Sequence, residues 1–478
     1  MNFNFPTTLT LGFIMTLISY SGLSTELTIS NVRMVNRTEL GIQPYVLFDL
    51  SWKNAWHNDK NHDAIWIFGK FNNNPWEHPI IYNQGHAIVK NRITNSPELK
   101  IEVSHDSIGM WIYLDSEYRG NVDVKVMMML DTTSQKIDWR KSKDFKVFGI
   151  EMVYIPEGSF TLGDASQQSE QFASFYQSDA QGNWQGNYTI NSEDEIMVGP
   201  QQGSLYYWSE EDLYNGDQQG PIPAEFPKGT QPFYVMKYEL TQGQYADFLT
   251  QLPENWSSIR NPIGGKNYHK KKGTIYYEDG KYYAKDPNRS MNYVSFTDGL
   301  AYTDWAGLRP ITELEYEKAC RGPEKPKAGE FVWGASDYTQ LERYVNRDGQ
   351  TVLQNGISED QLNDNNRAVF GASYYWVMDL SGSVWEKVIT VGNPMGRAFR
   401  GTHGDGLLDY GNATNDDWPA SDNDKGGFGY RGGGYYDIGT EYSDYNPHSP
   451  IGYRYYGAWS GGPRAIAYGY RAGRSAGK

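Results

Sequence analysis

A single cysteine, Cys320, in a chain of 478 residues that contains 51 glycines is the feature that most restricts how this sequence can fold. One thiol permits no internal disulfide, so the loops must be held by packing and hydrogen bonds. Tyr (37) and Trp (15) are abundant, and their rings combine a large apolar area with a polar end. Disordered chains are poor in aromatics. The sequence therefore predicts a loop-rich globular protein, long enough for two or three domains.

The charge balance argues against nucleic acids and anionic membrane surfaces as partners. The chain has 43 Lys and Arg against 58 Asp and Glu, which gives a net charge of −15. Nucleic acids and anionic membrane surfaces require a basic binding surface. We therefore expect no nucleic-acid partner, whereas divalent cations are compatible with the charge.

An apolar run covers residues 7–23, with the sequence TTLTLGFIMTLISYSGL. It is short and polar for a membrane span but fits a secretory h-region, with a small-residue cleavage site at 22–24. The preceding residues contain no Lys or Arg, so a buried first strand is the alternative. We expect a signal peptide over 1–24, no membrane span after its removal, and a secreted, periplasmic or cell-surface protein.

Residues 26–146 have the pattern of an all-β domain. Short β-branched or aromatic runs such as YVLFDLSW, DAIWIFGKF and VDVKVMMML are separated by turn-rich segments. Six or more such runs predict an antiparallel, immunoglobulin-like sandwich. The charged stretch 134–149 is interpreted as a linker.

After Phe148 the pattern changes to an α+β one. Residues 148–164 predict a strand, a Pro-Glu-Gly turn and a second strand, and 164–230 predict long surface loops. Three helices follow, with Thr241, Thr297 and Thr312 as expected N-caps. The expected buried positions of the third helix are Leu314, Tyr316, Ala319 and Cys320.

Several segments of this region, in order, resemble one known family. They are GIEMVYIPEGSFTLGD (149–164), FYVMKYELTQGQYADFL, VSFTDGLAYTDWAGLRPITELEYEKACRG, MDLSGSVWEKV (378–388), YRGGG (430–434) and YGYRAGR (468–474). They are similar to the sulfatase-modifying-factor, or formylglycine-generating-enzyme, domain. The resemblance covers about 148–476 and implies a C-type-lectin-like α+β fold with little regular structure.

The resemblance implies a calcium site at MDLSGSVWEKV. Its ligands would be the side chains of Asp379 and Glu386 and the carbonyls of Gly382 and Val384. Calcium prefers six to eight hard oxygen ligands in a flexible cage, and a glycine turn lets carbonyls converge between two carboxylates. Most members of the family have Asn where this chain has Ser383.

A second calcium site is also implied. Its ligands would be Asn346 and Asp360 by side chain and Arg347 and Leu362 by carbonyl. For both sites the alternative is a solvated acidic turn, or a carboxylate that caps backbone N–H groups.

The family's enzymes work through a cysteine pair that binds copper, because Cu(I) prefers thiolates. The corresponding positions in this chain fall near Asp437 and Tyr442, and neither is a thiol. We therefore expect no copper.

Another branch of the family uses iron held by histidines. The eight histidines here, at 57, 62, 78, 86, 105, 269, 403 and 448, form no H-x-x-x-H pair. A site made of His403, Asp405 and His448 is conceivable, but a surface histidine is the ordinary interpretation, so iron is not expected.

The C-terminal region is dense in Tyr, Gly, Asp, Asn and Ser, residues that make adaptable recognition surfaces. They can equally fill a loop-rich fold. The candidate ligand-binding residues are Trp385, His403, Asp437 and Tyr442, while Arg431 and Arg471 are expected to pair with buried carboxylates or carbonyls. The main hypothesis is a secreted, non-catalytic, calcium-stabilised protein that binds a protein or glycan. The alternative is a metal-dependent oxidoreductase that acts on a protein or small molecule.

Overall fold

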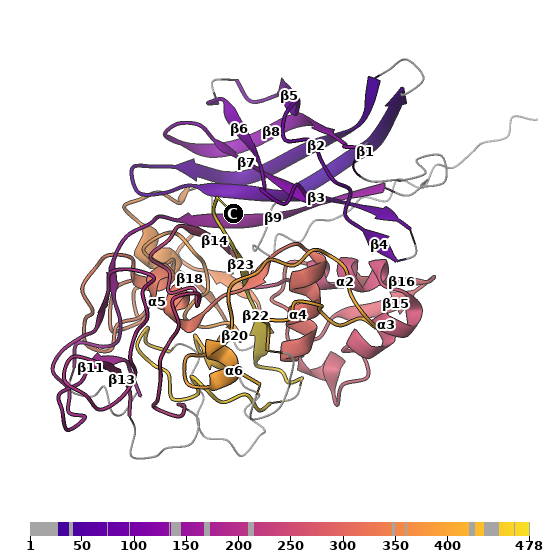
Figure 1. Cartoon of the computed structure of the whole chain (residues 1–478). Helices are drawn as coiled ribbons and strands as arrows, with labels where there is room; N and C mark the ends of the chain where they lie inside the picture. Colours follow the sequence, from indigo (N-terminus) through magenta and orange to yellow (C-terminus); the bar gives the residue numbers. More distant parts are fainter. Residues whose placement is uncertain are drawn as a thin grey trace, which may run out of the picture.

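The structure is a computed structural model of the whole chain, and Figure 1 shows its course. The residues that it describes are 27–37, 42–73, 75–94, 96–132, 134, 145–166, 173–208, 215–346, 349–358, 361–419, 426–434, 449–462 and 464–477. The predicted signal peptide at 1–24 lies outside these ranges.

The first eight strands form the upper part of Figure 1 and belong to two sheets. β1, β2, β8 and β5 make a four-stranded antiparallel sheet, and β3, β4, β6 and β7 belong to a larger one. The bounds are β1 Thr28–Arg37, β2 Ile42–His57, β3 Asp63–Asn72, β4 Trp76–Glu77, β5 Ala87–Asn91, β6 Leu99–Val103, β7 Gly109–Leu114 and β8 Tyr118–Met129.

The larger sheet continues into the second half of the chain. Its order is β17-β23-β14-β9-β3-β7-β6, and β4 pairs with β3. β3 pairs with β9 over nine consecutive positions, from Asp63 opposite Val153 to Phe71 opposite Phe145. The added strands are β9 Phe145–Ile155, β14 Phe233–Met236, β17 Arg309–Pro310 and β23 Ala472–Ser475. Strands from both sides of the predicted domain boundary at 146–148 therefore share one sheet.

Side chains of a strand alternate between the two sides of a sheet, and β3 is covered on both sides. Ile65 and Ile67 pack into the core between the two sheets, while Trp66 and Phe68 pack into the core shared with the helices. The indole N–H of Trp66 also donates to the Ala306 carbonyl at 2.9 Å. β3 thus connects the two cores.

The helices lie below the large sheet in Figure 1. They are α2 Gln242–Gln251, α3 Glu254–Arg260, α4 Phe296–Trp305, α5 Glu313–Arg321 and α6 Pro394–Arg397, with 3-10 turns η2 Tyr268–Lys271 and η4 Arg367–Phe370. Thr241 and Thr312 cap α2 and α5, as predicted. The prediction of Thr297 as a cap was wrong: Ser295 caps α4, because its hydroxyl accepts the Asp298 N–H while Asp298 bonds back to the Ser295 N–H.

The remaining strands are short and lie in the loop-rich lower body. They are β10 Phe160–Thr161, β11 Tyr176–Gln177, β12 Thr189–Ile190, β13 Leu205–Tyr206, β15 Ile275–Glu278, β16 Lys281–Ala284, β18 Arg343–Val345, β19 Thr351–Leu353, β20 Trp385–Ile389, β21 Phe428–Arg431 and β22 Tyr468–Tyr470. The loops between 173 and 230 are partly internal, since Phe175, Tyr207 and Phe226 are fully buried.

The protein is an α+β chain with more strand than helix, as expected. The linker predicted over 134–149 was wrong for 145–149, because these residues begin β9 and pair with β3. In the described part of the chain, no helix has the length and apolarity needed to cross a bilayer.

Candidate metal and ligand sites

The 379–386 segment forms a tight turn that leads into β20. Asp379, Gly382 and Ser383 all have positive φ angles, of 61°, 120° and 59°. Gly382 suits this conformation because it has no Cβ. Its N–H donates to the Gly432 carbonyl at 2.8 Å, which ties the turn to the segment after β21.

Both predicted carboxylates of the turn are paired with arginines. Arg343 donates to the two oxygens of Asp379 at 2.7 and 3.1 Å. Arg471 donates through Nε and Nη2 to Oε1 of Glu386, at 2.8 and 2.7 Å. Arg471 and Glu386 are almost completely inaccessible. The expectation that Arg471 pairs with a buried carboxylate is confirmed.

A third carboxylate, Glu239, completes the group and was missed in the sequence. Glu239 is 1% exposed, and its Oε1 accepts the N–H of Val384 at 3.1 Å. Glu239 precedes α2, 145 positions before Val384. The available signal was an acidic residue between the apolar Tyr238 and Leu240, just ahead of a helix cap.

If all three carboxylates were ionised, they would carry more negative charge than the two guanidinium groups neutralise. Burial raises the pKa of Glu239 well above its usual value, and Glu386 and Asp379 raise it further. Burial also raises the pKa of Glu386, against the attraction of Arg471. Within the described ranges, Oε2 of Glu239 and Oε2 of Glu386 are buried without a hydrogen-bond partner. Such oxygens call for a proton or a cation.

The carboxylates do not converge on one point. Among the residues that the structure describes, no three or more His, Cys, Asp or Glu side chains are placed to hold one metal ion. The donor chemistry of Glu239 and Glu386 fits a hard cation, with Asp379 engaged by Arg343.

The second implied calcium site lies largely outside the described residues, because Arg347 and Asp360 are both outside. The Asn346 side-chain oxygen accepts the N–H of Gln350 at 3.1 Å within its own turn. Leu362 is 9% exposed and packs in an apolar cluster.

Beside the turn lies a group of rings, here named the aromatic cluster. Its rings contact one another at centroid distances of 4.9–6.5 Å. Trp385 and Tyr430 are buried, and the other five rings are partly exposed. The members are Trp385, Tyr430, Tyr453, Tyr455, Tyr456, Trp459 and Tyr468.

Trp385 is a buried member of this cluster. It is 2% exposed and packs against Tyr453 and Tyr456 at 6.2 and 5.6 Å. A ligand would therefore reach Trp385 through these tyrosines. Asp437 and Tyr442 lie outside the described residues.

The family of the chain follows from a comparison with family profiles. The profile of the sulfatase-modifying factor enzyme 1-like domain (FGE-sulfatase) matches residues 141–444, which is more than half of the chain. The chain belongs to the FGE-sulfatase family.

Curated relatives within and around this family match shorter stretches. An uncharacterised protein of Bacillus subtilis is 26% identical over 168 residues, or 32% of this chain and 33% of the relative. Hercynine oxygenase of Mycobacterium tuberculosis is 25% identical over 165 residues, or 32% and 36%. Mouse formylglycine-generating enzyme is 30% identical over 100 residues, or 21% and 26%. The matches thus span about a third or less of each relative.

Cys320, the one thiol of this FGE-sulfatase member, is fully buried on α5. Burial raises the pKa of its thiol well above the ordinary value, which disfavours the reactive thiolate. The four predicted buried positions of α5 are all confirmed.

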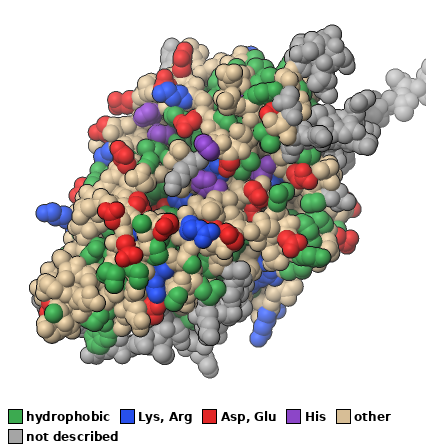
Figure 2. All heavy atoms as spheres, viewed as in Figure 1, with side chains coloured by type: hydrophobic (Ala, Val, Ile, Leu, Met, Phe, Trp, Pro, Cys, Tyr) green, Lys and Arg blue, Asp and Glu red, His purple; other side chains and the backbone are tan. Residues whose placement is uncertain are grey.

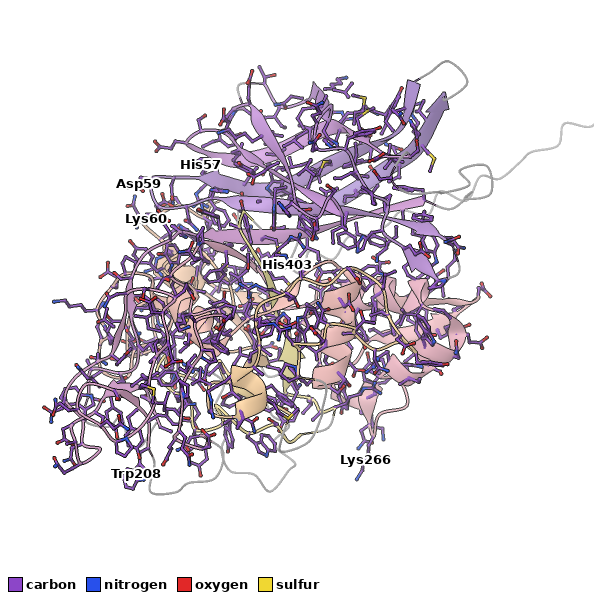
Figure 3. The ribbon with its side chains drawn as sticks, viewed as in Figure 1. His57, Asp59, Lys60, Trp208, Lys266 and His403 are labelled. Carbon is purple, nitrogen blue, oxygen red and sulfur yellow. The ribbon has the colours of Figure 1, made fainter. Side chains whose placement is uncertain are left out.

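His403 lies at the junction of the upper strands and the lower body, as Figure 3 shows. Its Nε2 accepts the N–H of Ser475 in β23 at 3.0 Å. Asp405 accepts the Leu407 N–H in its own loop at 2.9 Å, and His448 lies outside the described residues. His403 is thus held against β23, whereas Trp385 packs within the aromatic cluster. These two predicted ligand-binding residues have different surroundings.

Proposed function

We propose that this chain is a secreted, non-catalytic FGE-sulfatase member that binds a protein or glycan through its aromatic cluster. The observation that carries the proposal is the group of five partly exposed rings beside the 379–386 turn, two of which, Tyr453 and Tyr456, pack on Trp385 at tilted and edge-on angles. Tyr and Trp supply a large contact area at low entropic cost, with polar tips for hydrogen bonds.

The single cysteine supports a role without copper chemistry. The full sequence contains one cysteine, and Cu(I) sites in this chemistry use soft thiolate ligands. Cys320 is buried within α5, apart from the aromatic cluster. The chain therefore has no pair of thiols with which to bind copper and activate oxygen.

We further propose that a calcium ion occupies the 379–386 turn. Glu239 and Glu386 would hold it through their unpartnered oxygens, together with the carbonyls of Gly382 and Val384, while Asp379 stays paired with Arg343. The ion would neutralise the excess negative charge and connect the turn to the loop before α2. The competing arrangement is a proton on Glu239, which the raised pKa of that group also supports.

The finer features of the fold belong to the same proposal. The core between the two N-terminal sheets supports an immunoglobulin-like sandwich, and the loop-rich lower body supports a lectin-like domain. The apolar run at 7–23 supports secretion.

Arrays of glycans and of peptides test ligand binding directly. The wild-type chain is expected to bind members of one array, and Tyr455→Ala or Trp459→Ala to lose that binding while still unfolding in a cooperative transition. Trp459→Ala should also lower the melting temperature, because this ring packs against the main core. A matched control is Tyr338→Ala, which removes a ring that is 60% exposed elsewhere. Binding that survives both cluster substitutions would refute the role of this face.

The alternative function is a metal-dependent oxidoreductase. The similarity to hercynine oxygenase and to formylglycine-generating enzyme favours it. An oxygen electrode, with iron or copper supplied together with thiol peptides or histidine betaines, tests it. We expect no oxygen consumption above that of the buffer; sustained turnover would establish the alternative.

A further inference from the structure

A tyrosine-rich hairpin lies within a basic segment of this acidic protein. The segment 266–289 contains seven Lys and Arg but only three Asp and Glu, whereas the whole chain has a net charge of −15. Within it, β15 and β16 form an antiparallel pair, with Tyr276 opposite Tyr283 and Glu278 opposite Lys281. Figure 1 places the hairpin at the edge of the lower body, beside α3.

One face of the hairpin packs against the core near its base, whereas Tyr277, toward the tip of that same face, is 52% exposed. On the inner face, Ile275 is fully buried and Tyr282 packs against the main core. Since side chains alternate along a strand, Tyr276 and Tyr283 lie on the opposite face. Tyr283 is 41% exposed there, so this face is open to solvent.

The outer face combines stacked rings with cations. The rings of Tyr276 and Tyr283 are 5.6 Å apart and inclined by 26°. The Lys285 ammonium lies 5.9 Å from the centre of the Tyr276 ring, and Lys281 is exposed on the same strand face. The face thus presents a platform of two rings flanked by the ammonium groups of Lys281 and Lys285, with the Glu278 carboxylate opposite Lys281.

We propose that this hairpin face binds an acidic polysaccharide. The tyrosine rings would stack against the apolar faces of sugar rings, and Lys281 and Lys285 would pair with carboxylates that the polymer carries at intervals. A nucleic acid is the poorer fit, because its phosphates are dense and the hairpin offers few cations beside Glu278. This surface is separate from the aromatic cluster and goes beyond the proposed function.

Binding of fluorescent oligogalacturonate to the full chain tests the proposal. Reversing two charges, in Lys281→Glu with Lys285→Glu, should weaken binding at least about tenfold, which corresponds to about 1.4 kcal/mol. Tyr283→Ala should also weaken it, but with an unchanged dependence on salt. The control Lys90→Glu with Lys325→Glu makes the same change of net charge at exposed positions elsewhere and should bind as the wild type does.

Two further ligands separate the contributions of charge and ring. Methyl-esterified oligogalacturonate keeps the rings without the charge and should bind weakly, and single-stranded oligothymidylate should bind more weakly than oligogalacturonate. If the double variant fails to fold, the single variant Lys285→Gln is used instead, and it should also bind oligogalacturonate more weakly than the wild type. Undetectable binding of oligogalacturonate, equal effects of hairpin and control variants, or tighter binding of oligothymidylate would overturn the proposal.

Discussion

The ammonium group of Lys70 lies in the interior, on β3, below the loop that contains Asp405. Lys70 is fully buried, and within the described ranges its Nζ has no hydrogen-bond partner. Burial lowers the pKa of Lys70 to about 7, against the attraction of Asp304 and Asp405. Asp304 itself accepts backbone N–H groups from Asp405, Gly406 and Thr414 at 3.0 Å. Its charge therefore does not depend on Lys70 alone.

This lysine predicts a dependence of stability on pH. An unfolded lysine has a pKa of about 10.4. Between pH 7 and 10 the unfolded chain therefore binds a proton that the folded chain does not, and stability rises with pH. The wild type should gain about 1.4 kcal/mol per pH unit relative to Lys70→Met across this window.

Urea unfolding of both proteins at about pH 7.5 and about pH 9.5 measures this gain. Comparison with Lys70→Met removes the contributions of other groups, such as Lys318, whose pKa burial lowers to about 8. Equal pH dependence in the two proteins would show that Lys70 is charged in the fold.

Glu239 predicts how the fold responds to calcium. If calcium binds at the 379–386 turn, Glu239→Gln removes one of its ligands. The melting temperature of this variant in calcium should then equal that of the wild type in EGTA. At a hundred times Kd the bound ion stabilises the fold by about 2.7 kcal/mol. If Glu239 instead carries a proton, glutamine replaces it closely. A melting temperature that neither the substitution nor EGTA alters would exclude the calcium site.

At the level of elements, α5 depends on its N-terminal cap. The Thr312 hydroxyl accepts the Glu315 N–H at 3.1 Å and donates to the Pro227 carbonyl at 2.9 Å. Thr312→Ala should cost about 1–2 kcal/mol, and more than Thr241→Ala on α2, because it also leaves a carbonyl unpaired. Thermal unfolding of the two variants shows which one loses more stability. Thr312→Ser keeps the hydroxyl and should retain most of the wild-type stability. A larger loss for Thr241→Ala would contradict the expected order.

The same elements show what the sequence could predict. The caps at Thr241 and Thr312 depend on contacts within three residues, so their pattern is visible in the sequence. At α4, two hydroxyls compete, and only the return bond of Asp298 selects Ser295. The start of β9 was missed because its strand character comes from pairing with β3. Glu239 was missed for the same kind of reason, since its partners are distant in sequence.

At the scale of the molecule, the shared sheet predicts that the chain unfolds as one unit. β3, β7 and β6 continue the sheet of β9, β14 and β23, and β3 belongs to both adjoining cores. Separating the two halves would expose both faces of β3 to water. Differential scanning calorimetry should therefore show one transition. Two resolved transitions would instead support independent domains with a boundary near 146–148.

The surface is consistent with a protein that recognises partners by local features. Figure 2 shows acidic and basic side chains interspersed over the viewed face, although the chain as a whole is acidic. The aromatic cluster and the β15–β16 hairpin are two such local features. Calorimetric titration of each surface with its own ligand, before and after saturating the other, should give unchanged affinities.

We propose that a calcium ion at the 379–386 turn stabilises this fold and that the chain holds no thiolate-bound copper. Elemental analysis of the purified chain, after desalting from a calcium-containing buffer, tests it most directly. We predict calcium in stoichiometric amount with only traces of iron and copper. Stoichiometric iron or copper, with calcium at background level, would contradict the account.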